Sequence, residues 1–215
     1  MNTPTKITFS RIIAIVLMMI ALFVLSLIPG LVTPNYNFGI ENGWTGLNLV
    51  YIILFVFFLI ASYTDHLDGK LARKNNQVTN LGKFLDPVAD KLLINSMVIF
   101  LVLAWNFAPG QMQFSVWCAI LLVARDIVVD AIRFIAAQKG KVIAANIFGK
   151  MKTVFEMVAI CFVLLNDFPF ALLYGSACPV GLRVTDFFVY LATAMSVISG
   201  VIYVIQSKDV LKEDK

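Results

Sequence analysis

Four aspartates lie between positions 65 and 90 of a chain that carries 13 acidic residues in all. Asp65 and Asp68 are three positions apart, and Asp86 and Asp90 are four positions apart. Residues at these spacings share one face of a helix, so each pair presents two carboxylates on the same side. Four carboxylates brought together repel one another unless cations neutralise them. The pattern therefore predicts an all-oxygen site for hard divalent cations, and two such cations could clamp a diphosphate.

The residues that follow the first aspartate pair suit phosphate chemistry. Gly69 directly follows Asp68, and its missing side chain would let a ligand approach the helix backbone. Ala72 is also small and lies on the same helix face, three positions later. Arg73 can donate two parallel hydrogen bonds to a phosphate group. These residues make a phosphate-containing ligand the natural partner of the predicted cations.

An ordinary solvated turn between two helices is the competing interpretation of this segment. In that case the acids would pair with nearby cations, namely Lys70, Arg73, Lys83 and Lys91. This interpretation does not explain why two same-face acidic pairs stand beside an almost uncharged apolar span, where ionisable groups are costly and tend to mark function. The functional interpretation is therefore favoured.

The composition is that of an integral membrane protein. Hydrophobic residues make up 60% of the 215 positions and charged residues only 14%, whereas soluble domains carry about 25% charged residues. We expect one all-α membrane domain over residues 1–215, with a retained first helix and a lipid bilayer, not nucleic acid, as its partner. Its six transmembrane helices are expected at 12–32, 48–64 (continuing to 73), 92–108, 114–138, 153–168 and 187–206.

The distribution of lysine and arginine predicts the orientation. Sixteen of the 17 basic residues fall before the first span, after the last, or between the apolar parts of spans two and three and of spans four and five, and only Arg183 falls on the other side. By the positive-inside rule, both termini of this multi-pass protein face the cytoplasm, as expected at a plasma membrane. The aspartates then lie at the cytoplasmic ends of spans two and three, in a polar active-site cavity open to the cytoplasm.

The complete motif resembles the signature of the CDP-alcohol phosphotransferase family. It reads D-x-x-D-G-x-x-A-R, eight residues, then G-x-x-x-D-x-x-x-D, and this chain matches every fixed position. The resemblance implies a six-helix membrane fold, two divalent cations (Mg²⁺ or Mn²⁺) and a homodimer. It also implies that an alcohol attacks the β-phosphate of a CDP-linked substrate and releases CMP.

Carried over position by position, the resemblance implies a role for each motif residue. Asp90 looks like the general base that deprotonates the acceptor hydroxyl. The four aspartates look like the metal ligands: Asp65, Asp68, Asp86 and Asp90. The small or basic residues of the motif look like parts of the CDP site: Gly69, Ala72, Arg73 and Gly82.

A second group of charged residues lies around the fourth and fifth spans. Arg125, Asp126, Asp130 and Arg133 would fall within an arc of about 140° on a helix, and Gly-Lys-Met-Lys-Thr occupies 149–153. Positive-inside anchoring with Asp–Arg pairing is one interpretation, and binding of an anionic acceptor is the other. Under the second, the cations that would hold the acceptor phosphate are Arg125, Arg133, Lys150 and Lys152.

This half of the chain is similar to the branch of the family that transfers a phosphatidyl group from CDP-diacylglycerol to sn-glycerol 3-phosphate. The similarity rests on Arg125-Asp126, Arg133, the 149–153 segment and the amino terminus. Two positions depart from the pattern, Asp130 and Glu156. Either acid could change the acceptor pocket or pair with Arg133 or Lys152.

Three alternative functions compete with this interpretation. Another family member, such as a cardiolipin, phosphatidylserine or inositol-phosphate lipid synthase, would share the aspartate motif. A metal-ion transporter would also need acids, but its sites lie near the bilayer midplane and not at one face. A catalytically inactive relative is disfavoured because no motif position is lost.

The assignment of Asp90 as the general base makes the first testable prediction. Asp90→Asn should abolish CMP release, because an amide cannot accept the proton of the attacking hydroxyl. Membrane insertion of the variant should persist, as judged by its recovery in the membrane fraction. Turnover at the wild-type rate would refute the assignment.

Overall fold

Helices make up most of the structure, a computed structural model that describes residues 3–37, 43–74, 80–139, 146–174 and 177–208. Side chains are described for these residues apart from 3–4, 66–74 and 80–84. The chain divides into two compact units. The first comprises Met1–Gln113 with Leu164–Asn166, and the second comprises Phe114–Val163 with Asp167–Lys215.

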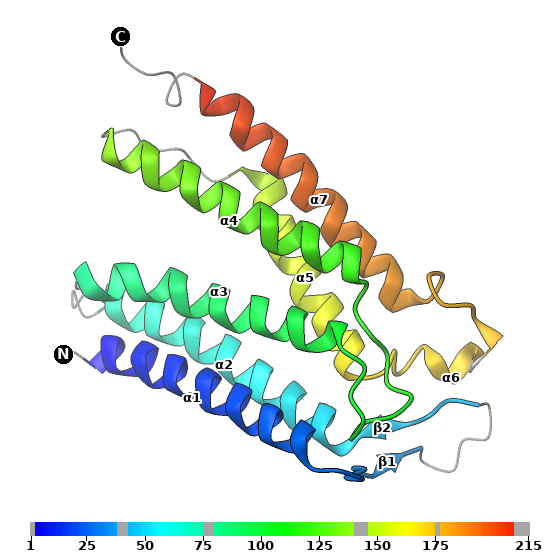
Figure 1. The fold of residues 1–215 in the computed structure, drawn as a ribbon. Coiled ribbons are helices and arrows are strands. Elements are labelled where there is room, and N and C mark those ends of the chain that lie inside the picture. The colour runs from blue at the N-terminus through cyan, green and yellow to red at the C-terminus, as the bar shows by residue number, and fades with distance from the viewer. Residues whose placement is uncertain (1–2, 38–42, 75–79, 140–145, 175–176, 209–215) are drawn as a thin grey trace. The chain divides into compact units, whose positions relative to one another are not determined.

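Three long helices form the first unit: α1 (Thr3–Leu27), α2 (Leu49–Lys74) and α3 (Asn80–Val102). They run side by side, and α1 packs against both of the others (Figure 1). Between α1 and α2 the chain forms a short antiparallel pair of strands, β1 (Asn35–Tyr36) and β2 (Leu47–Asn48). This unit carries all four aspartates of the motif.

Only one face of α1 is buried, and its first turns are polar there. Thr5, Thr8 and Arg11 are each at most 5% exposed, and Ile15 continues the same stripe. The opposite face is apolar and exposed; Phe23, for example, is 61% exposed. Exposed apolar surface along a whole helix is what hydrocarbon would cover. The buried polar turns must instead find partners on α2 and α3.

A buried asparagine starts α2 and ties it to the strands. The Asn48 Oδ1 atom accepts a hydrogen bond from the Val50 amide at 3.0 Å, which caps the first turn. Its Nδ2 atom donates to the Thr33 carbonyl and to Asn35 Oδ1. Gly46 precedes β2 with a φ of 82°, and a Cβ there would lie 2.6 Å from the Tyr36 carbonyl oxygen. Only glycine suits this approach.

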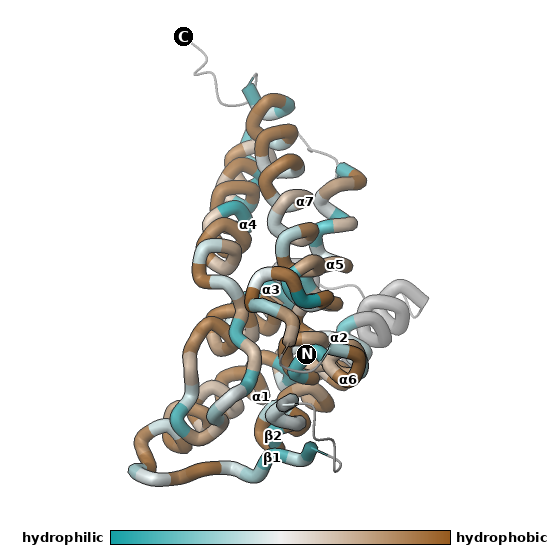
Figure 2. The backbone as a smooth tube through the Cα atoms, turned by 90° about the vertical axis from the view of Figure 1, so that its right-hand side faces the viewer, coloured by the Kyte–Doolittle hydropathy of each residue, from teal (hydrophilic) through white to brown (hydrophobic). Residues whose placement is uncertain are grey.

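The second unit contains α4 (Val116–Gln138), α5 (Ile147–Leu164), the short α6 (Ala171–Tyr174) and α7 (Val184–Gln206). α4 packs against α7 (Figure 1), and hydrophobic residues run along most of both helices (Figure 2). The buried stripe of α7 is nevertheless partly polar, with Ser196, Ser199 and Tyr203 at 0% exposed. Small residues at such positions let two helices approach closely.

A helix is present at each of the six predicted positions, with different limits. The first begins at Thr3 instead of residue 12, because its polar turns are buried, and it ends at Leu27, before Pro29. The third begins at Asn80, so Pro87 lies inside it, and it ends at Val102 instead of 108. The fifth begins at Ile147, six residues before the apolar run. The strand pair and α6 were not predicted.

Membrane association is supported by two helices. Within the described residues, the segments Thr5–Leu27 and Val184–Gln206 are long and apolar enough to cross a bilayer, and Leu49–Asp65 is a shorter apolar segment. The remaining long helices combine apolar runs with polar turns, as the sequence predicted.

Candidate active site

α1 holds one aspartate from α2 and one from α3. Arg11 Nη1 donates to Asp65 Oδ1 in an ion pair. Three positions earlier on the same face, Thr8 Oγ1 donates to Asp86 Oδ1 at 2.8 Å. Arg11 is only 5% exposed, so its charge requires this partner. Two of the predicted metal ligands are therefore oriented by one face of α1.

The contacts from α1 are of the kind that supports metal ligands. A carboxylate that accepts a hydrogen bond on one oxygen can still bind a cation through the other, and such supporting bonds fix its direction. The donors are all oxygen, which suits Mg²⁺ or Mn²⁺. Asp90 follows Asp86 by one turn of α3, is half-buried and has partners of its own.

The rest of the motif lies outside the described side chains: Asp68, Gly69, Ala72, Arg73 and Gly82. Among the side chains that are described, no group of three or more acidic, histidine or cysteine residues could hold a metal ion.

Sequence reasoning missed Thr8 and Arg11 as parts of this site. In the sequence, Arg11 is one of the basic residues before the first span and part of the amino-terminal resemblance, and neither points to a contact with an aspartate. A signal was present, because Thr5, Thr8 and Arg11 repeat every three residues and lead into an apolar helix. Such a polar stripe indicates a buried partner on another element.

The second group of predicted residues centres on a buried ion-pair cluster between α4 and α5. Lys152 Nζ lies 2.8 Å from Asp126 Oδ2 and 2.6 Å from Glu156 Oε2. Lys152 is 3% exposed and Glu156 is 0% exposed. The ammonium group thus compensates two carboxylates that would be costly to bury alone. The pairing of Glu156 with Lys152, one of the two outcomes left open by the sequence, is confirmed.

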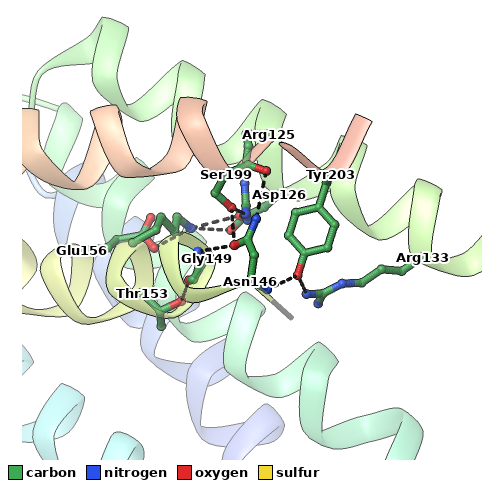
Figure 3. Close-up of polar contacts among 10 residues, drawn as sticks. Arg125, Asp126, Arg133, Asn146, Gly149, Thr153, Glu156, Ser199 and Tyr203 are labelled. Carbon is green, nitrogen blue, oxygen red and sulfur yellow. Dashed lines mark hydrogen bonds and ion pairs between the residues drawn. The ribbon is translucent and has the colours of Figure 1, made fainter. Parts of the chain in front are cut away.

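Arg125 joins this cluster to α7. Its Nη1 atom donates to Asp126 Oδ1 at 3.0 Å, and its Nη2 atom donates to Ser199 Oγ. Gly200 makes room for the side chain, and Figure 3 shows Arg125 together with Asp126 and Ser199. A Cβ on Gly200 would lie 3.1 Å from Arg125 Cγ, whereas one on Gly149 would crowd Asn146 Oδ1 at 3.0 Å and Ser199 Oγ at 3.3 Å. The glycine of the 149–153 segment therefore serves packing rather than backbone conformation.

Arg133 and the start of α5 meet at Tyr203. Arg133 Nη2 donates to the Tyr203 hydroxyl, which also accepts a hydrogen bond from the backbone N–H of Asn146 at 3.3 Å (Figure 3). Asn146 caps α5, because its Oδ1 atom accepts from the Gly149 amide at 2.6 Å. Sequence reasoning assigned no function to Asn146, Ser199 or Tyr203, since nothing in their local spacing points to α4.

The four predicted acceptor cations therefore differ in their surroundings. Arg125 and Lys152 belong to the ion-pair cluster with Asp126 and Glu156, whose two negative charges balance theirs. Arg133 and Lys150 are exposed. Exposure makes these two cations accessible to an incoming anion.

Comparison with known proteins identifies the family. The family model for CDP-alcohol phosphatidyltransferases matches residues 1–199, which include both compact units up to the middle of α7. The chain belongs to the CDP-alcohol phosphatidyltransferase family. Membership accounts for the complete aspartate motif, and the match extends well beyond it.

Similar members of this CDP-alcohol phosphatidyltransferase family carry one name, CDP-diacylglycerol–glycerol-3-phosphate 3-phosphatidyltransferase. The protein of Bacillus subtilis strain 168 is 36% identical over 212 residues, which cover 98% of this chain and 97% of that protein. The Mycoplasma pneumoniae protein is 40% identical over 73% of this chain and 67% of its own length. A Salmonella choleraesuis protein is 34% identical over 76% of each chain.

The buried ion-pair cluster predicts a contrast between two lysines of the 149–153 segment. Lys152→Met would leave Asp126 and Glu156 buried without their cation, which should lower the free energy of unfolding by about 3–5 kcal/mol. The exposed Lys150→Met should change it by less than about 0.5 kcal/mol. Thermal unfolding in mild detergent measures both. Equal shifts would show that Lys152 is not needed to neutralise the cluster.

Proposed function

We propose that the chain transfers the phosphatidyl group of CDP-diacylglycerol to sn-glycerol 3-phosphate, giving phosphatidylglycerophosphate and CMP. The observation that carries the proposal is the similarity to the Bacillus subtilis enzyme of that name over nearly the whole of both chains. The aspartates of the first unit suit the donor's diphosphate, and the cations of the second suit an acceptor that bears a phosphate.

On the donor side, the proposed metal ligands are Asp65, Asp68, Asp86 and Asp90. The bonds from Thr8 and Arg11 support this role, since they would hold Asp86 and Asp65 in place before a cation arrives. When bound, two divalent cations would neutralise the diphosphate and stabilise the charge that develops on CMP. The proposed CDP contacts are Gly69, Ala72, Arg73 and Gly82.

Asp90 would take up the proton in the transfer step. The hydroxyl oxygen of the acceptor forms a bond to the β-phosphorus of CDP-diacylglycerol, and the bond from that phosphorus to the oxygen of CMP breaks. The hydroxyl proton passes to the Asp90 carboxylate. CMP leaves with the electron pair of the broken bond, so no oxidant or further reactant is required.

On the acceptor side, Arg133 and Lys150 would bind the phosphate directly, since both are exposed. A guanidinium carries five N–H groups, and the two observed hydrogen bonds of Arg125 use only two of them. Arg125 would donate to the acceptor phosphate through the others. Its Nε is buried and has no partner among the described residues. Lys152 would act by holding Asp126 in place, in contrast to the direct contact suggested by the sequence, because its ammonium already faces two carboxylates.

The proposed setting is a single domain of six membrane-spanning helices in the plasma membrane, with both termini in the cytoplasm. The bias of basic residues supports this orientation, and the continuous family match over residues 1–199 supports a single domain. A homodimer is proposed on the family resemblance alone.

An acceptor screen tests the reaction. The purified protein is supplied with CDP-diacylglycerol labelled in its phosphatidyl group, Mg²⁺ and one candidate acceptor at a time: sn-glycerol 3-phosphate, inositol phosphate, serine or phosphatidylglycerol. We expect labelled phosphatidylglycerophosphate and CMP with the first acceptor only. A product with another acceptor would reassign the enzyme within its family. Chelation of divalent cations should stop the reaction, and undiminished activity would contradict the metal ligands.

The contact from α1 gives a separate prediction about metal affinity. Thr8→Val keeps the shape of the side chain but removes the donor to Asp86. It should weaken Mn²⁺ binding about tenfold, as loss of a supporting bond to a metal ligand does. Ser10→Ala is the matched control, because Ser10 is exposed on the same helix and donates only within it.

Electron paramagnetic resonance of free Mn²⁺ measures this affinity without turnover. If the Thr8→Val and Ser10→Ala variants have the same affinity for Mn²⁺, the Thr8 hydroxyl does not orient a metal ligand.

A further inference from the structure

One fully buried tyrosine of α7 contacts both arginines of the proposed acceptor site. Tyr203 is 0% exposed. The Cζ atom of Arg133 lies over its ring at 4.9 Å from the centroid, and that of Arg125 at 5.8 Å. The hydroxyl accepts hydrogen bonds from Arg133 and from the Asn146 amide. Figure 3 shows the ring between Arg133 and the residues around Arg125.

These contacts restrict side chains that would otherwise move freely. A free arginine samples many rotamers, and binding an anion requires it to give up that freedom. A cation near the face of an aromatic ring is attracted to it, and the attraction is stronger where water is excluded. The ring attracts a cation without carrying a negative charge, so it can orient a guanidinium without neutralising it.

The two kinds of partner in this cluster therefore have different consequences. Asp126 and Glu156 are negative, and they compensate the charges of Arg125 and Lys152. Tyr203 is neutral, so it orients Arg133 without cancelling any of its charge. The Asn146 contact links the same hydroxyl to the residue that caps α5, one helical turn before Lys150.

We propose that Tyr203 is a positioning residue for the acceptor phosphate, which aims Arg133 and Arg125 and thereby determines the affinity for the acceptor. The inference rests on the proposed function for the identity of the acceptor. Its observable consequence is selective: loss of Tyr203 weakens acceptor binding and leaves binding of the CDP-linked donor unchanged.

Three variants separate this role from simple packing. Tyr203→Phe keeps the ring and removes the hydroxyl, and Tyr203→Leu removes the aromatic face as well. Tyr190→Leu is the matched control, since Tyr190 lies on the same helix and is 47% exposed. Initial rates of CMP release give the apparent KM for each substrate with the other held saturating. Thermal unfolding with and without inorganic phosphate measures anion binding in the absence of turnover.

Tyr203→Leu should raise the apparent KM for sn-glycerol 3-phosphate about tenfold and change that for CDP-diacylglycerol by less than about twofold. Tyr203→Phe should raise the apparent KM for sn-glycerol 3-phosphate about threefold. Stabilisation by phosphate should fall in the same order, and Tyr190→Leu should match the wild type. The inference would be overturned if both KM values changed equally or if neither changed. If Tyr203→Leu does not fold, the KM values of Tyr203→Phe decide the question.

The same measurements separate the inference from the proposed function. If the wild type transfers to sn-glycerol 3-phosphate but neither Tyr203 variant alters acceptor KM, only the role of Tyr203 is wrong. If the wild type shows no such transfer yet phosphate stabilises it and Tyr203→Leu abolishes that effect, the reaction is wrong and the anion site stands. If the wild type neither transfers nor responds to phosphate, both are wrong.

Discussion

A charge inside an apolar helical protein needs an opposite charge, and this requirement governs the arrangement of both units. In the second unit, Lys152 of α5 lies between Asp126 of α4 and Glu156 of its own helix. In the first, the buried Arg11 of α1 pairs with Asp65 of α2. Removing one partner of such a pair would leave the other charge without compensation in surroundings of low polarity, which is strongly destabilising. The ion pairs therefore specify how each unit's helices align along one another.

Close packing of small residues makes these pairings possible. Gly200 leaves the space that Arg125 occupies, and the Ser199 hydroxyl accepts a hydrogen bond from it. Similar helices with larger residues there would be pushed apart, and the guanidinium would lose its partner. The aspartate site and the cation cluster thus share one principle. In both, the proposed functional side chains are oriented by polar residues from a neighbouring helix.

Much of the fold could be predicted because its signals are local. The expected helix at 48–73 is α2 at Leu49–Lys74, and the one at 114–138 is α4 at Val116–Gln138. Apolar runs and capping residues mark such limits within a few positions of the chain. The start of α1 was misplaced because residues 3–11 look like a solvated tail until their buried partners are known. The strand pair was missed for the same reason, as two residues per strand carry no pattern.

The sequence by itself determined the aspartate spacing, the family and the set of candidate cations, since each is a matter of residue types at short intervals. Only the tertiary structure decided which cations are compensated and which are exposed, and which residues orient them. Thr8 is 78 positions from Asp86, and Arg133 is 70 positions from Tyr203. No local periodicity relates residues so far apart. Their contacts arise only when whole helices pack, and packing depends on the summed shape and charge of every facing side chain.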